Sequence, residues 1–366
     1  MSVDDAVQPG ERTTETVSAT PEQEQQPTPP RRHRGLRRAL IALGVLVLVF
    51  VLVVGGAVWF LTARYAGNIH RIDNAFTGLN ENSRPAPSTP QPGQNAPPVT
   101  FLLLGSDTRD HPAPGQDPGS RSDATMLFRL SGDRQHAQVI SIPRDSWVPI
   151  PGHGVSKINA AYSWGGTPLA IQTVEQLTGV RIDHVVAIDF DGIIKVTDEL
   201  GGVDVNVAQT TSWGPYTFHA GMNHLNGDQA RWYVGQRYGL PGGDFDREKR
   251  QQQYLKSMFG KLFSSGTFSS PTQLDAALRT VTGAVAVDSS LSNTDLVGLA
   301  YSGRSLRPEN IQYFTAPVLG TGMEGDQSVV YLDKTNDDRM WAYLRSDSLG
   351  QNASEFSRDA LPDVPN

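Results

Sequence analysis

The longest hydrophobic stretch of the chain runs from Ala39 to Thr62 and contains 24 residues without a charged side chain. As a helix this stretch would span ~36 Å, which exceeds the ~30 Å hydrocarbon core of a bilayer. It is too long, and lies too far from the first residue, for the apolar region of a cleaved signal peptide. The pattern therefore predicts one transmembrane helix over residues 39–62.

Charge is distributed unevenly around this predicted helix. Five arginines stand in the eight residues from Arg31 to Arg38, whereas the next arginines are only Arg64 and Arg71. By the positive-inside rule, residues 1–38 form a cytoplasmic tail, which its polar composition predicts to be disordered, and the rest of the chain lies outside. We therefore expect a single-pass protein of the cell membrane with an extracytoplasmic carboxyl-terminal domain.

Residues 63–98 are expected to connect the membrane helix to that domain. Ala66 to Leu79 predicts a short helical stalk, and Glu81 to Pro98 contains six prolines, which predict a stiff spacer. A similar polar composition returns at about Ser346, so residues 346–366 are predicted to be a disordered tail. One folded domain over residues 99–345 remains, and it is long enough to bury a sizeable core.

Apolar runs and helical periodicities alternate over this domain. Val99 to Leu104 is a continuous apolar run typical of a buried strand, and a turn at Ser131-Gly132-Asp133 predicts a hairpin of Ala124–Leu130 with Ala137–Ile142. Further strands are predicted at Val185–Ile188, Val203–Val207 and Ile311–Thr315, and helices at Thr167–Gly179, Phe190–Leu200, Asn226–Val234, Asp244–Phe263, Thr272–Val281 and Thr294–Ser302. The alternation predicts an α/β fold in which a central mixed β-sheet carries helices on both faces.

Composition excludes several classes of site. The chain contains no cysteine, which excludes a disulfide framework, a thiolate zinc site and a cysteine nucleophile. A net charge of −7, without a basic stripe beyond the segment before the membrane helix, argues against a nucleic-acid partner. No GxSxG, HExxH or P-loop string is present. Trp164, Trp213 and Trp232 are interpreted as core or surface aromatics rather than sugar platforms.

The predicted helix that begins near Asp244 concentrates positive charge. Arg247, Arg250, Gln251 and Tyr254 share one face at i, i+3, i+4 and i+7. Two guanidiniums on one face repel each other unless an anion lies between them, and the planar fork of arginine matches phosphate oxygens two at a time. The alternative is a solvated face with salt bridges to Asp244, Asp246 or Glu248.

Charged residues also lie at the ends of three predicted strands, either just after the strand or just before it. Asp107 follows the first strand, Arg121 and Asp123 precede the hairpin, and Arg144 follows Pro143 at the end of the hairpin's second strand. Ligands of open α/β sheets bind at such carboxyl ends, and two carboxylates can hold a magnesium ion against phosphate. Turn capping is the alternative for each aspartate alone. Lys157 and Asn159, in the segment KINAAY, either order a loop here or contact phosphate.

Six segments in this order resemble a known family. They read LLLGSDTRD, RSDATM, SIPRDSWV, KINAAYSWGG, DFDGIIKVTDELGGVDV and GGDFDREKRQQ. From Phe101 to about Gln253 the chain resembles the LytR-CpsA-Psr family of cell-wall glycopolymer transferases. The resemblance implies an α-β-α catalytic domain outside the membrane. It also implies transfer of a glycopolymer from a polyprenyl-pyrophosphate lipid carrier to a peptidoglycan hydroxyl, with release of polyprenyl phosphate.

The resemblance also implies roles for individual residues. Asp107 and Asp123 would hold Mg2+. The anion clamp would consist of Arg121, Arg144, Arg237, Arg247 and Arg250, with Asp244 and Gln251 as further substrate-binding residues. Arginine and magnesium suffice for phosphoryl transfer, because the protein mainly positions the groups and neutralises oxygen charge. The general base stays open between Asp107 and Asp244.

The chain departs from the family pattern at one position. Relatives usually carry an Arg-x-Arg pair where this sequence reads Gly235-Gln236-Arg237, so one clamp residue is missing. A weakened enzyme and a membrane-tethered glycan-binding module without turnover are therefore alternatives. A polyprenyl pyrophosphatase, which would differ from the transferase only in using water as acceptor, is a further one. The sequence does not specify the glycopolymer, the prenyl length or the oligomeric state.

Overall fold

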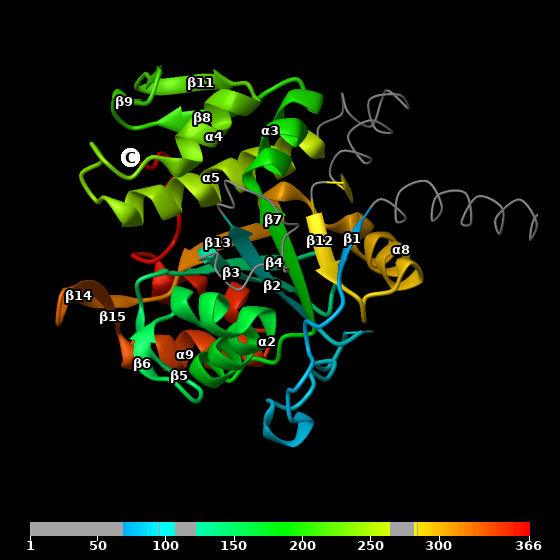
Figure 1. Ribbon diagram of the computed structural model, residues 1–366. Helices are drawn as coiled ribbons and strands as arrows, with labels where there is room; N and C mark the ends of the chain where they lie inside the picture. Colours follow the sequence, from blue (N-terminus) through cyan, green and yellow to red (C-terminus); the bar gives the residue numbers. More distant parts are fainter. Residues whose placement is uncertain (1–68, 95, 107–121, 264–281, 284) are drawn as a thin grey trace, which may run out of the picture. The chain divides into compact units, whose positions relative to one another are not determined.

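The computed structural model describes residues 69–94, 96–106, 122–263, 282–283 and 285–366. The chain divides into two compact units, residues 1–56 and 57–366, and every described residue belongs to the second. A seven-stranded mixed sheet runs through this unit in the order β1-β12-β7-β2-β3-β4-β13 (Figure 1). Its strands are β1 (His70–Ile72), β2 (Val99–Ser106), β3 (Ser122–Leu130), β4 (Ala137–Ile142), β7 (His184–Asp189), β12 (Val285–Asp288) and β13 (Ile311–Thr315).

Strand direction brings several chain segments to one edge of the sheet. β7 runs parallel to β2, β13 runs parallel to β4, and β3 lies antiparallel between β2 and β4. β12 is antiparallel to β7, and β1 is parallel to β12. The carboxyl ends of β2, β4, β7 and β13 therefore share one edge with the start of β3, which is where ligands of such sheets bind.

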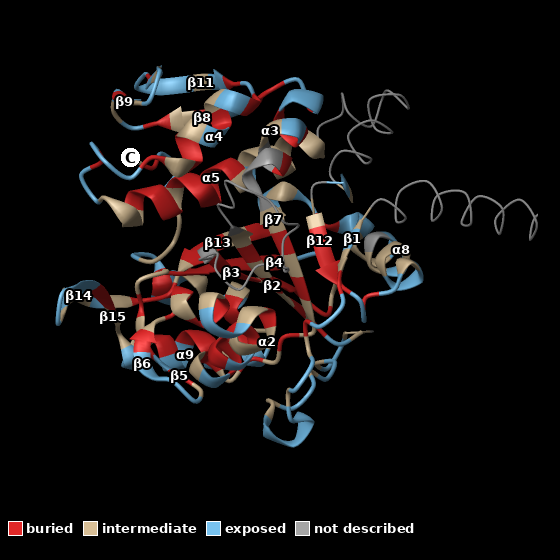
Figure 2. Ribbon diagram, viewed as in Figure 1, coloured by how far each residue is buried: buried red, intermediate tan, exposed pale blue. Residues whose placement is uncertain are grey.

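Side chains of β3 alternate between two cores. Leu127 packs in a cluster with α2 (Asn159–Thr178), α9 (Lys334–Arg345) and the 3-10 helix η5 (Leu349–Phe356). Met126 and Phe128 lie in a second cluster, which Leu255 and Phe259 of α5 (Asp244–Leu262) cover from the other side. Period-2 alternation thus places helices on both faces of the sheet, as the sequence predicted. Figure 2 shows that α5 and the central strands are largely buried.

A further layer covers the side of α5 that faces away from the sheet. It consists of α3 (Phe190–Glu199), α4 (Gly227–Gly235), the pair β8 (Val203–Val207) and β11 (Gly221–Leu225), and the pair β9 (Thr211–Trp213) and β10 (Tyr216–Phe218). Val205, Phe218, Tyr233 and Tyr254 share its core, and Tyr254 comes from α5. Because α5 is enclosed by this layer and the sheet, even its polar residues from Asp246 to Gln253 are buried, with Lys249 half-buried.

The strands and helices predicted between Val99 and Thr315 are confirmed, with small shifts in their bounds, wherever the structure describes them. The helix expected from Thr167 is the second part of α2, after non-helical backbone at Gly165 and Gly166, and it ends at Gly179 with a φ of 63°. The helix expected at Thr272–Val281 lies outside the described residues. The remaining elements are η2 (Glu81–Ser83), β5 (Trp147–Ile150), β6 (Gly154–Lys157), α8 (Asn293–Ser302), η3 (Gly303–Ser305), η4 (Pro308–Asn310), β14 (Val318–Glu324) and β15 (Gln327–Leu332).

The predicted stalk and spacer over residues 63–98 are wrong for their described part. Instead of continuing a helix, Ile72 lies in β1, where its backbone pairs with that of Asp288 in β12. Its side chain is buried in the main core. The proline-rich segment is fastened to the domain: Arg84 binds Glu175 at 2.8 Å, and Gln94 donates to Asp347 at 2.7 Å. A Cβ on Gly132 would lie 2.5 Å from the backbone oxygen of Ala96, so only glycine allows this segment to approach the turn. The folded domain therefore starts before Val99.

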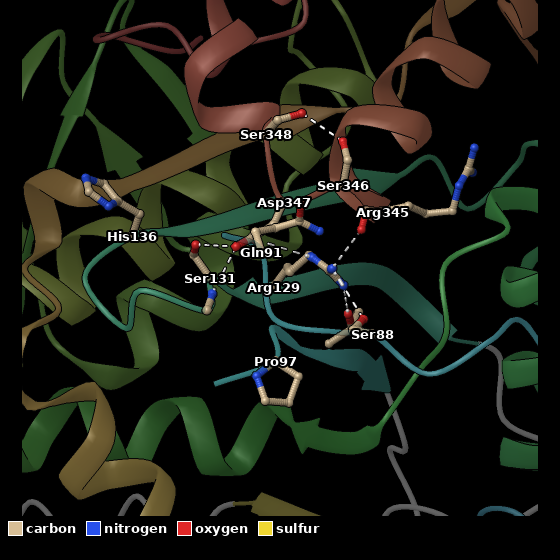
Figure 3. Close-up of polar contacts among 12 residues, drawn as sticks. Ser88, Gln91, Pro97, Arg129, Ser131, His136, Arg345, Ser346, Asp347 and Ser348 are labelled. Carbon is tan, nitrogen blue, oxygen red and sulfur yellow. Dashed lines mark hydrogen bonds and ion pairs between the residues drawn. The ribbon is translucent and has the colours of Figure 1, made fainter. Parts of the chain in front are cut away.

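The predicted disordered tail over residues 346–366 is also wrong. Leu349 and Phe356 are buried in the main core, and Ala360 pairs with Phe314 of β13. Asp347 accepts hydrogen bonds from the Ser131 hydroxyl at 2.6 Å and the Gly132 backbone at 3.0 Å, and it faces the buried Arg129 (Figure 3). The segment is polar on average, but several of its apolar residues pack in or against the main core, and these contacts hold the segment in place.

The predicted transmembrane helix over residues 39–62 lies outside the described residues. Within the part that the structure describes, no helix is both long enough and apolar enough to cross a bilayer.

Candidate functional site

Helix α5 is fixed across the carboxyl edge of the sheet by one buried amide. The Nε2 atom of Gln252 donates to the Ser141 hydroxyl of β4 at 2.7 Å and to the Phe314 backbone oxygen of β13 at 2.8 Å. Thr315 offers a third, longer contact at 3.3 Å. These bonds join the helix to two neighbouring strand ends, so the first turns of α5 stay in register with the residues that follow β4.

Two arginines and one aspartate meet at this edge. Arg144, directly after β4, donates from Nε to Oδ2 of Asp244 at 3.0 Å, and Arg247 donates from Nη2 to the same oxygen at 3.0 Å. Both guanidinium side chains are mostly buried, while the Asp244 carboxylate is 28% exposed. A carboxylate therefore lies between two arginine forks, at the sheet edge where an anionic ligand is expected.

Glu248 lies one helical turn after Asp244 and is buried. Burial raises the pKa of its carboxyl to about 8, and the nearby Asp244 adds to the rise. Arg247 and the backbone N–H of Arg144 oppose this rise in pKa. Its Oε2 atom has no hydrogen-bond partner within the described part of the chain. At neutral pH Glu248 is therefore mostly protonated, and the cluster of Arg144, Asp244, Arg247 and Glu248, the edge cluster, carries a net positive charge.

The loop that carries Arg144 is held by the segment KINAAY. The backbone N–H of Asn159 donates to the Arg144 carbonyl at 3.2 Å, and that of Ile158 donates to the Ser146 carbonyl at 2.9 Å. Lys157 pairs with Asp145 at 3.1 Å. Of the two interpretations of Lys157 and Asn159, the structure supports ordering of the Arg144 loop.

Arg250 does not share the environment of Arg247, contrary to the expectation from helical spacing. Its guanidinium is fully buried and donates to the backbone oxygen of Asn366 at 2.7 Å, to Oε1 of Gln236 at 2.7 Å and to the Thr211 hydroxyl at 2.9 Å. It also lies over the Tyr233 ring at 4.7 Å. The chain itself thus engages all three guanidinium nitrogens of Arg250, which makes it a structural residue.

Other predicted substrate-binding residues lie in the loop after α4 and on α5. Arg237 is exposed, and its Nη2 atom donates to the Tyr238 hydroxyl at 2.8 Å. Gln251 is buried and donates to the Val234 carbonyl at 3.4 Å. Gly235 ends α4, and a Cβ there would meet nothing within 4 Å, so the backbone leaves room for the missing arginine.

The predicted metal pair is outside what the structure describes. Asp107 and Arg121 fall in the segment 107–121, and the side chain of Asp123 is likewise not described. The backbone register pairs Ser106 at the end of β2 with Ser122 at the start of β3, which is the edge that also holds Arg144. Among the described residues, no group of three or more acidic or histidine side chains is arranged to hold a metal.

Sequence reasoning assigned no role to Glu248, Gln252 or Gln236. The run of glutamines after Arg250 was the available signal, because uncharged polar side chains inside an otherwise buried helix must find partners. For Glu248 the signal was its place one turn after Asp244. Neither signal identifies a partner: the groups that Gln252 binds, for example, lie more than sixty residues away along the chain.

Comparison with known proteins places this geometry in a family. A model of the LytR_cpsA_psr family matches residues 68–346. The polyisoprenyl-teichoic acid–peptidoglycan teichoic acid transferase TagU of Enterococcus faecalis is 29% identical over 270 residues, which cover 73% of this chain and 84% of the relative. TagU of Bacillus mycoides is 32% identical over 63% of this chain and 74% of its own length.

Solved structures agree with the sequence relatives. The crystal structure of B. subtilis TagV matches with a TM-score of 0.58 and 28% identity, covering 69% of this chain and 97% of TagV. TagT bound to LI-WTA matches with a TM-score of 0.55 and 26% identity, covering 71% of this chain and 96% of TagT. The family match spans most of the chain and includes both halves of the edge cluster. The chain therefore belongs to the LytR-CpsA-Psr family.

Proposed function

We propose that this protein transfers a glycopolymer from a polyprenyl-pyrophosphate carrier to a hydroxyl group of peptidoglycan. The observation that carries the proposal is the edge cluster, in which Arg144 and Arg247 converge on one carboxylate at the carboxyl edge of the sheet. The names of the relatives support the reaction class.

The proposed reaction needs little from the protein beyond charge and position. The acceptor oxygen attacks the phosphorus that carries the sugar, the bond from that phosphorus to the bridging oxygen breaks, and polyprenyl phosphate leaves with the electron pair. The forks of Arg144 and Arg247 would neutralise the phosphoryl oxygens as charge shifts to the leaving group. The proton of the acceptor hydroxyl passes to a carboxylate, for which Asp244 and Asp107 are the candidates. Arg121 and Arg237 remain predicted contributors to the clamp.

An apolar strip beside the edge cluster suits the prenyl chain. Leu103, Ala124 and Phe128 on β2 and β3 face Leu255 and Phe259 on α5, and all five are only partly buried. Each methylene of a prenyl chain that displaced water there would gain about 0.8 kcal/mol. The strip lies between the sheet and α5, so the pyrophosphate of a lipid held there would reach the first turn of that helix.

Magnesium is part of the proposal, with Asp107 and Asp123 as its ligands. Bound there, the ion would neutralise pyrophosphate oxygens. Replacing Asp123 by Ala should lower turnover by at least about 100-fold, while the urea midpoint should change little. Full turnover in excess chelator would contradict the magnesium requirement.

We also propose the anchored topology, with residues 39–62 spanning the cell membrane and the domain outside. Reporter fusions after Asn366 and before Met1 should be active outside and inside, respectively. The reverse pattern would contradict this location.

One experiment separates the three alternatives for the function. Full-length protein in detergent micelles is incubated with magnesium and a polyprenyl-pyrophosphate-linked glycan, with and without peptidoglycan strands. A transferase releases polyprenyl phosphate and forms a glycan–peptidoglycan phosphodiester. A pyrophosphatase yields free glycan phosphate alone, and a binding module yields neither. If wild-type protein, in which Arg144 and Arg247 are both present, forms no phosphodiester, the proposal is refuted.

A further inference from the structure

An exposed aromatic surface lies between β9 and the loop after α4. The ring of Trp213 packs against that of Tyr238, with centroids 5.6 Å apart and an interplanar angle of 40°. Tyr238 is 59% exposed, Trp213 is partly exposed, and the guanidinium of Arg237 lies 4.8 Å from the Tyr238 ring centroid. We name these three side chains the aromatic platform. Two adjacent rings beside a cation are thus open to solvent.

The turn that carries Trp213 is held against α4. Gly214, the residue after Trp213, has a φ of +58°, and a Cβ there would lie 2.4 Å from the ring of Trp232. Only glycine therefore allows the indole of Trp232, on α4, to pack directly beneath the turn that follows Trp213. Tyr216, at the end of the same turn, is held by a 2.6 Å hydrogen bond to Asp228 of α4.

Buried polar residues fix the two rings relative to each other. The Nε2 atom of Gln236 donates to the Tyr238 carbonyl at 3.1 Å and lies 3.5 Å from the Ser212 carbonyl. Its Oε1 atom accepts the 2.7 Å hydrogen bond from buried Arg250. The backbone beside each ring is therefore tied to one amide, and that amide is oriented by a charged group in the core. Such positioning is expected for a binding surface rather than for a chance contact.

The platform lies on the side of α5 away from the apolar strip. Trp213 and Trp232 pack on the cluster to which α5 contributes Tyr254, whereas Leu255 and Phe259 face the sheet. Figure 1 shows β9 and α4 on the far side of α5 from the central strands. Tyr238 precedes Asp244 by six residues, so the platform is within ~20 Å of the edge cluster along the chain.

This placement distinguishes the two substrates of the proposed reaction. In phosphoryl transfer the attacking and leaving oxygens lie roughly in line on opposite sides of the phosphorus. The leaving group is the lipid phosphate, whose prenyl chain the proposed apolar strip would hold between the sheet and α5. The attacking hydroxyl must therefore arrive from the other side, where the platform lies.

Contrary to the expectation from the sequence that Trp213 is an ordinary core or surface aromatic, we propose that the aromatic platform binds the glycan strand of the peptidoglycan acceptor. The C–H faces of sugar rings would stack on Trp213 and Tyr238. This inference rests on the proposed function for the identity of its ligand, but the platform's affinity for glycan can be measured without turnover.

The first experiment measures binding by calorimetry with full-length protein in detergent. The probes are uncrosslinked peptidoglycan strands and chitohexaose, a neutral glycan. Trp213→Ala and Tyr238→Ala should each weaken binding of both probes by at least 10-fold. Trp164→Ala is the matched control, because Trp164, in the first part of α2, is 48% exposed but packs against His153 in the β5–β6 turn, away from the platform. Unchanged affinity in both Trp213→Ala and Tyr238→Ala overturns the inference.

The second experiment separates acceptor from donor. In the transfer assay, Trp213→Ala should raise the KM for peptidoglycan at least 10-fold and leave the KM for the lipid-linked donor within 2-fold. A raised donor KM with an unchanged acceptor KM would assign the platform to the donor glycan and overturn the inference. Should wild-type protein bind both glycan probes through the platform but transfer nothing, the proposed function fails while the glycan site stands.

Discussion

Replacing Glu248 by glutamine tests the electrostatics of the edge cluster. The Gln side chain has the shape and the neutral charge of a protonated Glu, so it reproduces the state that burial imposes at neutral pH. Burial, reinforced by Asp244, raises the pKa of Glu248 from its ordinary value of 4.5 to about 8. In the unfolded chain the same carboxyl loses its proton near pH 4.5, while the folded protein keeps it.

The sign of the effect follows from this difference in pKa. As pH rises from 4.5 to 8, the unfolded state is increasingly favoured, because only it releases the proton. The two and a half pH units between 4.5 and 7 correspond to about 3 kcal/mol of unfolding free energy, at about 1.4 kcal/mol per unit. Glu248→Gln should therefore match wild type in stability near pH 4.5 and exceed it by about 3 kcal/mol at pH 7.

Urea denaturation of wild type and Glu248→Gln between pH 4.5 and 8 measures this difference. Asp337→Asn is the matched control for stability, since burial also raises the pKa of Asp337, which lies in α9, to about 8. Both variants should become more stable relative to wild type as pH rises, but only Glu248→Gln should change ligand binding. Inorganic pyrophosphate should bind wild type less tightly above pH 8, where Glu248 becomes anionic beside Arg144 and Arg247, and Glu248→Gln should lose that decline. A stability difference that does not vary with pH would refute the reasoning.

Three further substitutions test individual arginine positions. Arg247→Ala should lower turnover by at least about 100-fold, but stability by less than ~2 kcal/mol, because Asp244 keeps its bond to Arg144. Arg247→Lys keeps the charge but loses the fork, so its turnover should fall similarly. Full turnover in either variant would exclude the clamp. Arg250→Ala should lower the urea-derived unfolding free energy by about 3 kcal/mol or more, because it leaves buried partners unpaired, and an unchanged stability would contradict its structural role. Gly235→Arg should leave the melting temperature nearly unchanged, because the backbone leaves space there, and should raise turnover if the missing clamp residue limits it.

Local pattern was enough to predict most of the elements that hold the site. The apolar run from Val99 to Leu104, the hairpin around Gly132 and the amphipathic segment from Asp244 became β2, β3 with β4, and α5. Pro143 correctly placed Arg144 at the end of a strand, since proline cannot continue a ladder of backbone hydrogen bonds. The motifs also predicted the family, which the family model matches over residues 68–346.

Pattern was misleading where a few residues outweighed the composition of a segment. The chain after Ser346 is polar on average, but Leu349 and Phe356 fill the main core and Asp347 joins the β3–β4 turn. The proline-rich segment before Val99 was likewise expected to stand free. Arg84 and Gln94 attach it to partners more than ninety residues away along the chain. Composition averages over a segment, whereas attachment depends on single contacts.

The sequence by itself determined which side chains carry charge, where the strands end and which helix presents the arginines. Only the tertiary structure decided which group each arginine meets. Helical spacing places Arg247 and Arg250 near one another on α5, but this helix is enclosed on both sides, so Arg247 joins Asp244 while Arg250 enters the network of Gln236 and Thr211. Periodicity fixes the direction of a side chain relative to its own helix. Its partner, and with it the burial that sets the charge of Glu248, comes from segments that are distant in the chain and adjacent only after folding.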